Sequence, residues 1–310
     1  MNKKALLIFY LVALAFFSSN AQLSMLKTDT GVLIREGVRN VFLYRTAPEN
    51  DGEPCVMCNY LHPLYGLNGG ILTEDQPADH PHHRGVFWAW HQVLIDGEQI
   101  ADQWELQHFK QKIVEFEFMK QGSGNVLLKT EVDWLSDRWK KNGFEAPYIR
   151  EFTTIEVWPK AGNVRRIDFE IQLKALEEGV QLGGSDDEKG YGGFSVRLAL
   201  PDDVRFSGTN GKVEPENTPV TSPGYINIAG DFDRAGKPAG VVIIDNEDNP
   251  GYPQSWILRR KESMQNVVWP GSTPIDISIS EPLVLKYTML VYSGKLSNSK
   301  IQKFIDRSGI

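Results

Sequence analysis

The clearest pattern in the chain is an alternation of apolar and polar positions. In the segment 165–173, Ile167, Phe169, Ile171 and Leu173 fall on one face of an extended chain, while charged and polar residues fall on the other. The segment 113–118 alternates in the same way, but less regularly. A period of two is typical of strands with one buried face, so we expect a chain rich in β-structure.

Further segments rich in β-branched and aromatic residues follow one another, separated by turns that contain glycine, asparagine or proline. The expected strands are 31–36, 40–45, 56–61, 86–94, 113–119, 125–134, 148–158, 165–176, 194–200, 240–245, 256–258 and 283–292. One helix is expected over 300–306, with Ser297, Asn298 or Ser299 as its cap. The pattern predicts an all-β fold, a large antiparallel β-sandwich with a short C-terminal helix.

The first 21 residues have a different character. Lys3 and Lys4 precede an apolar run over 5–17, and small residues follow at 19–21. This is the pattern of a secretory signal peptide cleaved before Gln22. No later stretch approaches the 18 apolar residues of a membrane span. We therefore expect a periplasmic or secreted protein, not inserted in a membrane, with one β-sandwich domain over 22–310.

The charge balance narrows the choice of partners. The chain of 310 residues has a formal net charge of -7 and contains no basic run. An acidic protein of this kind is a poor candidate for binding nucleic acid.

Four of the six histidines lie within the thirteen residues 79–91: His80, His82, His83 and His91. Histidine changes its charge near neutral pH and is a common metal ligand, so such a cluster points to chemistry. Pro81 prevents a helix through the histidines. They are expected on a stiff loop that leads into the strand 86–94.

Strand alternation predicts which side chains converge. If the strand extends back to residue 82, His82, Arg84, Trp88 and Trp90 share one face, and His83 and His91 lie on the other. A guanidinium and indole rings together suit a polyhydroxylated or anionic ligand. Arg84 needs an internal counter-charge, for which Asp79, Glu151 and Asp102 are the candidates. A neighbouring cation would keep His82 neutral, as a general base requires.

Other segments add candidate residues. Glu151 lies within an otherwise apolar strand, and Asp102 and Glu105 flank Trp104. The glycine-rich segment 179–193 is either a solvated hairpin or a loop that lets the backbone approach a ligand, with Tyr191 and Arg197 as its polar contacts. The segment 245–253 is oxygen-rich, but its Asn, Pro and Gly favour a turn over a calcium site.

Cys55 and Cys58 are the only cysteines. In an oxidising compartment they could form a local disulfide, and otherwise they are free buried thiols. A redox function would need a βαβ context, which the pattern lacks.

The chain resembles a family of secreted bacterial domains that is often, and misleadingly, named after particulate methane oxygenase. The resemblance rests on H-P-L-Y at 62–65, D-H-P-H-H-R-G at 79–85, D-N-P at 248–250 with Pro253 and Trp256, and the closing segment 283–294. The name of a membrane oxygenase does not suit a chain without a later span. The family is similar in strand order to the galactose mutarotase-like supersandwich. That likeness implies a sugar-binding concave sheet with His80, His82, His83, Arg84, Glu151 and Arg197 in the concavity.

Three functions compete. The first is a carbohydrate-active enzyme, a glycoside hydrolase, lyase or sugar epimerase, with acid–base catalysis by His80, His82, His83 and Glu151. Its substrate, a carbohydrate or other small polar molecule, would contact a second group of residues. These are Arg84, Trp88, Trp90, His91, Asp102, Tyr191 and Arg197. The second is a non-catalytic carbohydrate-binding domain with the same contacts. The third is an enzyme with a divalent metal on His80, His82 and His83, although the residues call for no cofactor.

Overall fold

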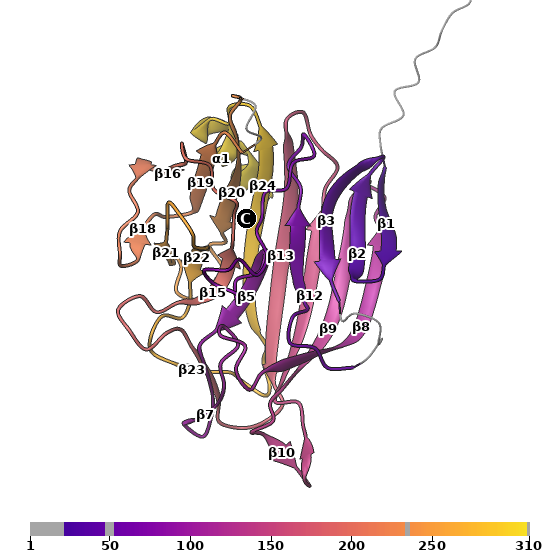
Figure 1. Cartoon of the computed structure of the whole chain (residues 1–310), viewed down its shortest axis with the longest axis vertical. Helices are drawn as coiled ribbons and strands as arrows, with labels where there is room; N and C mark the ends of the chain where they lie inside the picture. Colours follow the sequence, from indigo (N-terminus) through magenta and orange to yellow (C-terminus); the bar gives the residue numbers. More distant parts are fainter. Residues whose placement is uncertain (1–21, 47–52, 233–235, 309–310) are drawn as a thin grey trace, which may run out of the picture.

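A computed structural model of the chain describes residues 22–46, 53–232 and 236–308. Its strands form two nine-stranded sheets and two smaller ones, and every strand pair within them is antiparallel (Figure 1). The expected all-β sandwich with a short C-terminal helix is confirmed. The expected signal peptide, residues 1–21, lies outside the described residues.

The first large sheet carries the histidine segment. In spatial order it comprises β1 (Leu23–Thr28), β2 (Gly31–Glu36), β3 (Arg39–Arg45), β4 (Tyr60–Leu64), β5 (Val86–Trp90), β15 (Gly192–Val196), β22 (Gln265–Val268), β21 (Ser255–Ile257) and β18 (Val220–Thr221). The strand expected at 56–61 begins only at Tyr60, because the preceding residues form a disulfide-closed loop.

The second large sheet contains the longest strands. In spatial order it comprises β17 (Gly211–Val213), β16 (Arg205–Gly208), β19 (Tyr225–Gly230), β20 (Ala239–Asp245), β24 (Leu283–Ser293), β13 (Val164–Ala175), β12 (Ile149–Val157), β9 (Val126–Leu135) and β8 (Lys110–Lys120). The alternation at 165–173 lies in β13. Its apolar residues are buried there, because they face the first sheet across the main core.

Two smaller sheets complete the strands. One orders β23 (Ile275–Asp276), β14 (Val180–Gly183), β6 (Gln92–Ile95) and β7 (Glu98–Ala101), and the other pairs β10 (Lys140–Lys141) with β11 (Phe144–Glu145). The single strand expected over 86–94 is wrong: the chain leaves the first large sheet at His91 and continues in the four-stranded sheet. The histidine segment therefore lies where two sheets meet.

Three apolar clusters hold these layers together. The largest joins the inner faces of the two large sheets and includes Val86, Trp88 and Trp90 of β5. A second lies beneath α1 (Asn298–Ser308), where Leu296 and Ile301 cover the outer face of the second sheet. The third covers the outer face of the first sheet around Phe87 and Trp104. Consecutive β5 residues thus face opposite clusters, as the pleat of a strand requires.

The helix forms where the sequence predicted it. The backbone N–H of Lys300 donates to the Ser297 hydroxyl oxygen at 3.4 Å, so Ser297 caps the helix. Figure 1 shows α1 beside β19 and β20, at the opposite end of the molecule from β10. No helix among the described residues has the length and apolar character needed to span a membrane.

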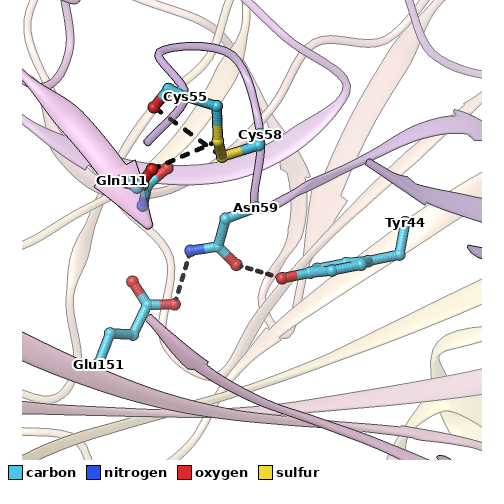
Figure 2. Close-up of a disulfide and its surroundings, with 6 residues drawn as sticks. All are labelled: Tyr44, Cys55, Cys58, Asn59, Gln111 and Glu151. Carbon is cyan, nitrogen blue, oxygen red and sulfur yellow. Dashed lines mark hydrogen bonds between the residues drawn. A yellow bond between two sulfur atoms is a disulfide. The ribbon is translucent and has the colours of Figure 1, made fainter. Parts of the chain in front are cut away.

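Cys55 and Cys58 form a disulfide, which settles the alternative left open by the sequence. The backbone N–H groups of Cys55 and Gln111 each donate to the other residue's carbonyl, at 2.7 and 2.8 Å. The bridged loop is thereby attached to β8, an edge strand of the second sheet (Figure 2).

Candidate active site

The histidine loop is held by backbone hydrogen bonds on two sides. The N–H of His83 donates to His80 O, and Gln76 N–H donates to His83 O at 2.8 Å. Gly85 then adopts φ +40°, and a Cβ at this position would overlap Leu61 O of β4. Only glycine suits such a close approach in the left-handed region, so the loop changes direction here before β5 begins.

Three imidazoles pack against one another at the outer surface of the first sheet. The rings of His80 and His83 stack with centroids 4.5 Å apart. The ring of His82 meets that of His83 edge-on at 4.7 Å and that of His80 at 5.8 Å. His83 is buried, while His80 and His82 keep side-chain exposures of 40% and 16%. The accessible part of the cluster is therefore formed by His80 and His82.

Carboxylates lie near the Nδ1 atoms of the three histidines of the segment 79–91 that are not fully buried. His91 Nδ1 is 2.9 Å from Asp102 Oδ2, and His82 Nδ1 is 3.2 Å from Glu105 Oε2. His80 Nδ1 is 2.7 Å from Asp79 Oδ2. The contacts of His80 and His91 are hydrogen bonds, whereas Glu105 lies within ion-pair distance of His82. A carboxylate at Nδ1 favours one orientation of an imidazole and leaves its Nε2 atom free.

Burial and neighbouring charges keep the central imidazoles neutral. Desolvation, followed by the charges of His80 and Arg84, lowers the pKa of His82 to about 4. Desolvation and the neighbouring histidines lower the pKa of His83 to about 2. His82 is therefore unprotonated at neutral pH, in the state that a general base needs.

These shifts predict a pH dependence of stability. Between pH 6.5 and 4 the unfolded chain protonates His82, but the folded protein does not, so the free energy of unfolding should fall as the pH is lowered through this window. Thermal melts at about pH 7 and pH 4.5 should show a smaller loss of Tm for His82→Asn than for the wild type. An equal loss in both proteins would show that His82 is not the group responsible.

Arg197 forms the rigid support of the loop. Its side chain is 1% exposed, Nε donates to Glu74 at 2.7 Å and Nη2 to Asp79 at 2.9 Å. Its Nη1 lies 3.3 Å from His83 Nδ1. Arg197 follows β15, and its guanidinium contacts residues before the histidines as well as His83 itself. All of these hydrogen-bond partners are groups of the protein.

Aromatic rings continue the site from the histidines. His91 stacks on Trp104 at 5.3 Å, and Trp104 contacts Tyr191 at 5.6 Å and the edge of His83 at 6.1 Å. Arg259 Nη2 donates to the Tyr191 hydroxyl at 3.0 Å. Trp104 is buried, whereas Tyr191 and His91 are half-buried and form the accessible part.

The sequence predicted only in part which residues share a face of β5. Trp88 and Trp90 are 2% and 0% exposed and belong to the core between the sheets. Arg84 lies over the ring of Phe87, 4.7 Å from its centroid, on the outer side. The prediction that His82 and Arg84 share a face with the two tryptophans is wrong, because Gly85 interrupts the strand geometry before Val86.

Glu151 is not part of the histidine cluster either. It lies on β12, fully buried between the sheets, and accepts hydrogen bonds from Asn59 Nδ2, Trp134 Nε1 and Thr153 Oγ1 at 2.9, 3.0 and 2.7 Å. Tyr44 donates to Asn59 Oδ1 at 2.7 Å and extends the network (Figure 2). Burial raises the pKa of Glu151. Its surroundings are those of a structural core carboxylate, and the prediction that it joins the histidines is wrong.

The remaining predicted residues meet in one place. The charges of His80, Arg84, His91 and Asp102 all act on the pKa of His82, and those of His80, His82 and Arg197 on that of His83. Tyr191 reaches the group through Trp104. Among the described residues, no group of three or more His, Cys, Asp or Glu side chains is arranged to hold a metal ion.

The sequence did not assign Trp104, Glu74 or Arg259 to the site, and named Glu105 without a role. The motif D-Q-W-E at 102–105 was the available signal for Trp104 and Glu105, since it places two carboxylates beside an indole. Glu74 and Arg259 carry no such local signal, because only tertiary contacts bring them to Arg197 and Tyr191.

The two loops singled out from the sequence are organised by their own hydrogen bonds. In the glycine-rich loop, Asp187 Oδ1 accepts from Ser185 Oγ, Lys189 N and Gly190 N. In the segment 245–253, Asn249 Nδ2 donates to Asp245 Oδ1 at 2.9 Å, which builds the expected turn.

The comparisons with known proteins give a family but no activity. Residues 32–306 match a family of unknown function, DUF6807, and the chain belongs to that family. No curated protein and no solved structure matches the chain significantly. The site must therefore be interpreted from its own chemistry.

Proposed function

We propose that the protein is a carbohydrate-active enzyme, of the glycoside hydrolase, lyase or sugar epimerase class, that works by histidine acid–base catalysis outside the cytoplasm. The observation that carries the proposal is the pair His82 and His91, with carboxylates at both Nδ1 atoms. Within the described part of the chain, neither Nε2 atom has a hydrogen-bond partner. Two oriented imidazoles with free Nε2 atoms can serve as base and acid.

The surroundings suit a sugar. Tyr191 supplies a half-buried aromatic ring, which can pack on an apolar sugar face. His80 and His91 supply polar groups for hydroxyls. The leader-like segment 1–21 supports an exported protein, and the resemblance inferred from the sequence motifs is the reason to expect a sugar ligand.

A panel of purified oligosaccharides tests the proposal. The protein should convert at least one of them to a product that NMR detects, at a rate proportional to enzyme concentration. Binding without conversion across the panel would identify a non-catalytic carbohydrate-binding domain instead. Conversion that requires an added divalent metal would favour the metal-dependent alternative.

A further inference from the structure

Arg84 is a buried cation with no carboxylate in direct contact. Its side chain is 2% exposed, and burial lowers its guanidinium pKa to about 10, so it stays charged at neutral pH. No carboxylate in the described residues lies within 4.0 Å of its guanidinium, so the partners expected from the sequence, Asp79, Glu151 and Asp102, do not pair with it. Burying a charge without a partner is costly unless a ligand compensates for it.

One edge of this guanidinium is unused. Nη1 donates to His82 O at 3.0 Å, and the ring of Phe87 covers one face. Neither Nε nor Nη2 of Arg84 donates a hydrogen bond in the described structure. Neither atom is completely buried without a partner, so each keeps some contact with solvent. The Nε–Nη2 edge presents two parallel donors, which match the two oxygens of a carboxylate.

The neighbouring groups do not satisfy this edge. Asp75 acts on Arg84 through its charge but lies beyond 4.0 Å from the guanidinium. Its Oδ2 accepts from the Tyr60 hydroxyl at 3.1 Å, and its buried Oδ1 accepts no hydrogen bond. Arg197 provides the contrast within the same cluster, since it is equally buried and is paired with two carboxylates. Of these two arginines, Arg197 is paired with carboxylates and Arg84 has none within 4.0 Å.

We propose that Arg84 binds the carboxylate of an acidic sugar, so that the substrate is a uronic acid-containing saccharide and His82 removes the proton from the carbon next to that carboxylate. This inference rests on the proposed function and names its substrate class. Arg84 bonds the backbone of His82 and acts on its imidazole electrostatically, so anion and base are neighbours. A guanidinium on the carboxylate stabilises the negative charge that develops there as the proton leaves.

The step balances without a further reactant. His82 Nε2 takes the proton from C5, and the C–H electron pair forms a C4=C5 double bond. The C4–O4 bond breaks, its electrons go to O4, and O4 takes a proton from His91 Nε2. His82 then returns its proton to water and His91 regains one from water. The product is an unsaturated uronate and a shortened saccharide with a new hydroxyl.

The test compares uronic acid oligosaccharides with neutral oligosaccharides of the same linkage. We expect conversion of an acidic member only, with ultraviolet absorbance from the new conjugated double bond. Arg84→Gln should lower kcat/KM by at least about 100-fold, the smallest loss expected for two hydrogen bonds to a charged group. Arg84→Lys keeps the charge but loses the planar edge, and should give a smaller loss. Arg205→Gln removes an exposed arginine from β16 and should leave kcat/KM unchanged.

Several outcomes would overturn the inference. If only neutral saccharides are converted, the proposed function stands and the acidic substrate is wrong. If neither class is converted, both fail. Equal kcat/KM for the wild type and Arg84→Gln would remove the role of Arg84, and equal kcat/KM for the wild type and Arg84→Lys would remove the role of its planar edge. The substrate preference of the wild type tests the inference even if Arg84→Gln does not fold. A preference for sulfated over carboxylated saccharides would also contradict it.

Discussion

Replacing His82 by asparagine is expected to lower turnover of any substrate that the wild type converts by at least about 100-fold, since a general base contributes typically about 100- to 10,000-fold. Asparagine puts a smaller polar group in place of an imidazole that keeps 16% side-chain exposure on the loop, outside the strands of the core. Far-ultraviolet circular dichroism should therefore remain that of the wild type. The measurement is kcat/KM of the two proteins on the same substrate.

The matched control is His108→Asn. His108 also has a carboxylate at Nδ1, Asp137 at 2.8 Å, but is 38% exposed and lies outside the cluster. Asparagine tolerates the left-handed conformation of His108, φ 54°. This variant should keep wild-type activity. Full activity of His82→Asn, or an equal loss in both variants, would show that the histidine cluster is structural.

Replacing Glu151 by alanine is expected to destabilise the fold by roughly 3 kcal/mol or more, because it opens a core cavity and leaves buried donors unpaired. The donors that lose their acceptor are Asn59, Trp134 and Thr153. For a chain of this size the Tm should fall by roughly 5 °C or more. Thermal or denaturant unfolding measures the effect.

Two further variants separate the causes. Glu117→Ala makes the same substitution at a position of β8 outside the core in the same sheet, and should change stability by about 0.5 kcal/mol or less. Glu151→Gln keeps the volume and should lose less stability than Glu151→Ala. If Glu151→Ala kept the wild-type Tm and lost activity, Glu151 would be a site residue after all.

The sequence was informative where the relevant contacts are local. Alternation over 165–173 predicts β13, and the cap at Ser297 predicts α1, because both depend on residues within a few positions of one another. The crowding of His80, His82 and His83 likewise needs no tertiary information, since Pro81 and the short loop keep them together.

Long-range partners could not be predicted in this way. Arg84 was expected to pair with Asp79, but Asp79 is 118 positions away in sequence from its actual partner, Arg197. Glu151 resembled a site carboxylate because an acid in an apolar strand has two explanations, a cleft or an internal network. The tertiary structure decides for an internal network, because it brings Trp134 and Asn59 within hydrogen-bonding distance of Glu151.

The sequence by itself determined the strand-rich fold, the helix and the residues of the histidine loop, because periodicity and turn chemistry act over short distances. Tertiary structure alone decided which face the side chains take where the histidine loop enters β5. Gly85 adopts φ +40° against Leu61 O, and this contact turns Arg84 toward Phe87 while Trp88 and Trp90 enter the core. The surroundings of Arg84 and Arg197 depend on this change of direction at Gly85, since a buried charge can be compensated only by groups that packing brings within reach.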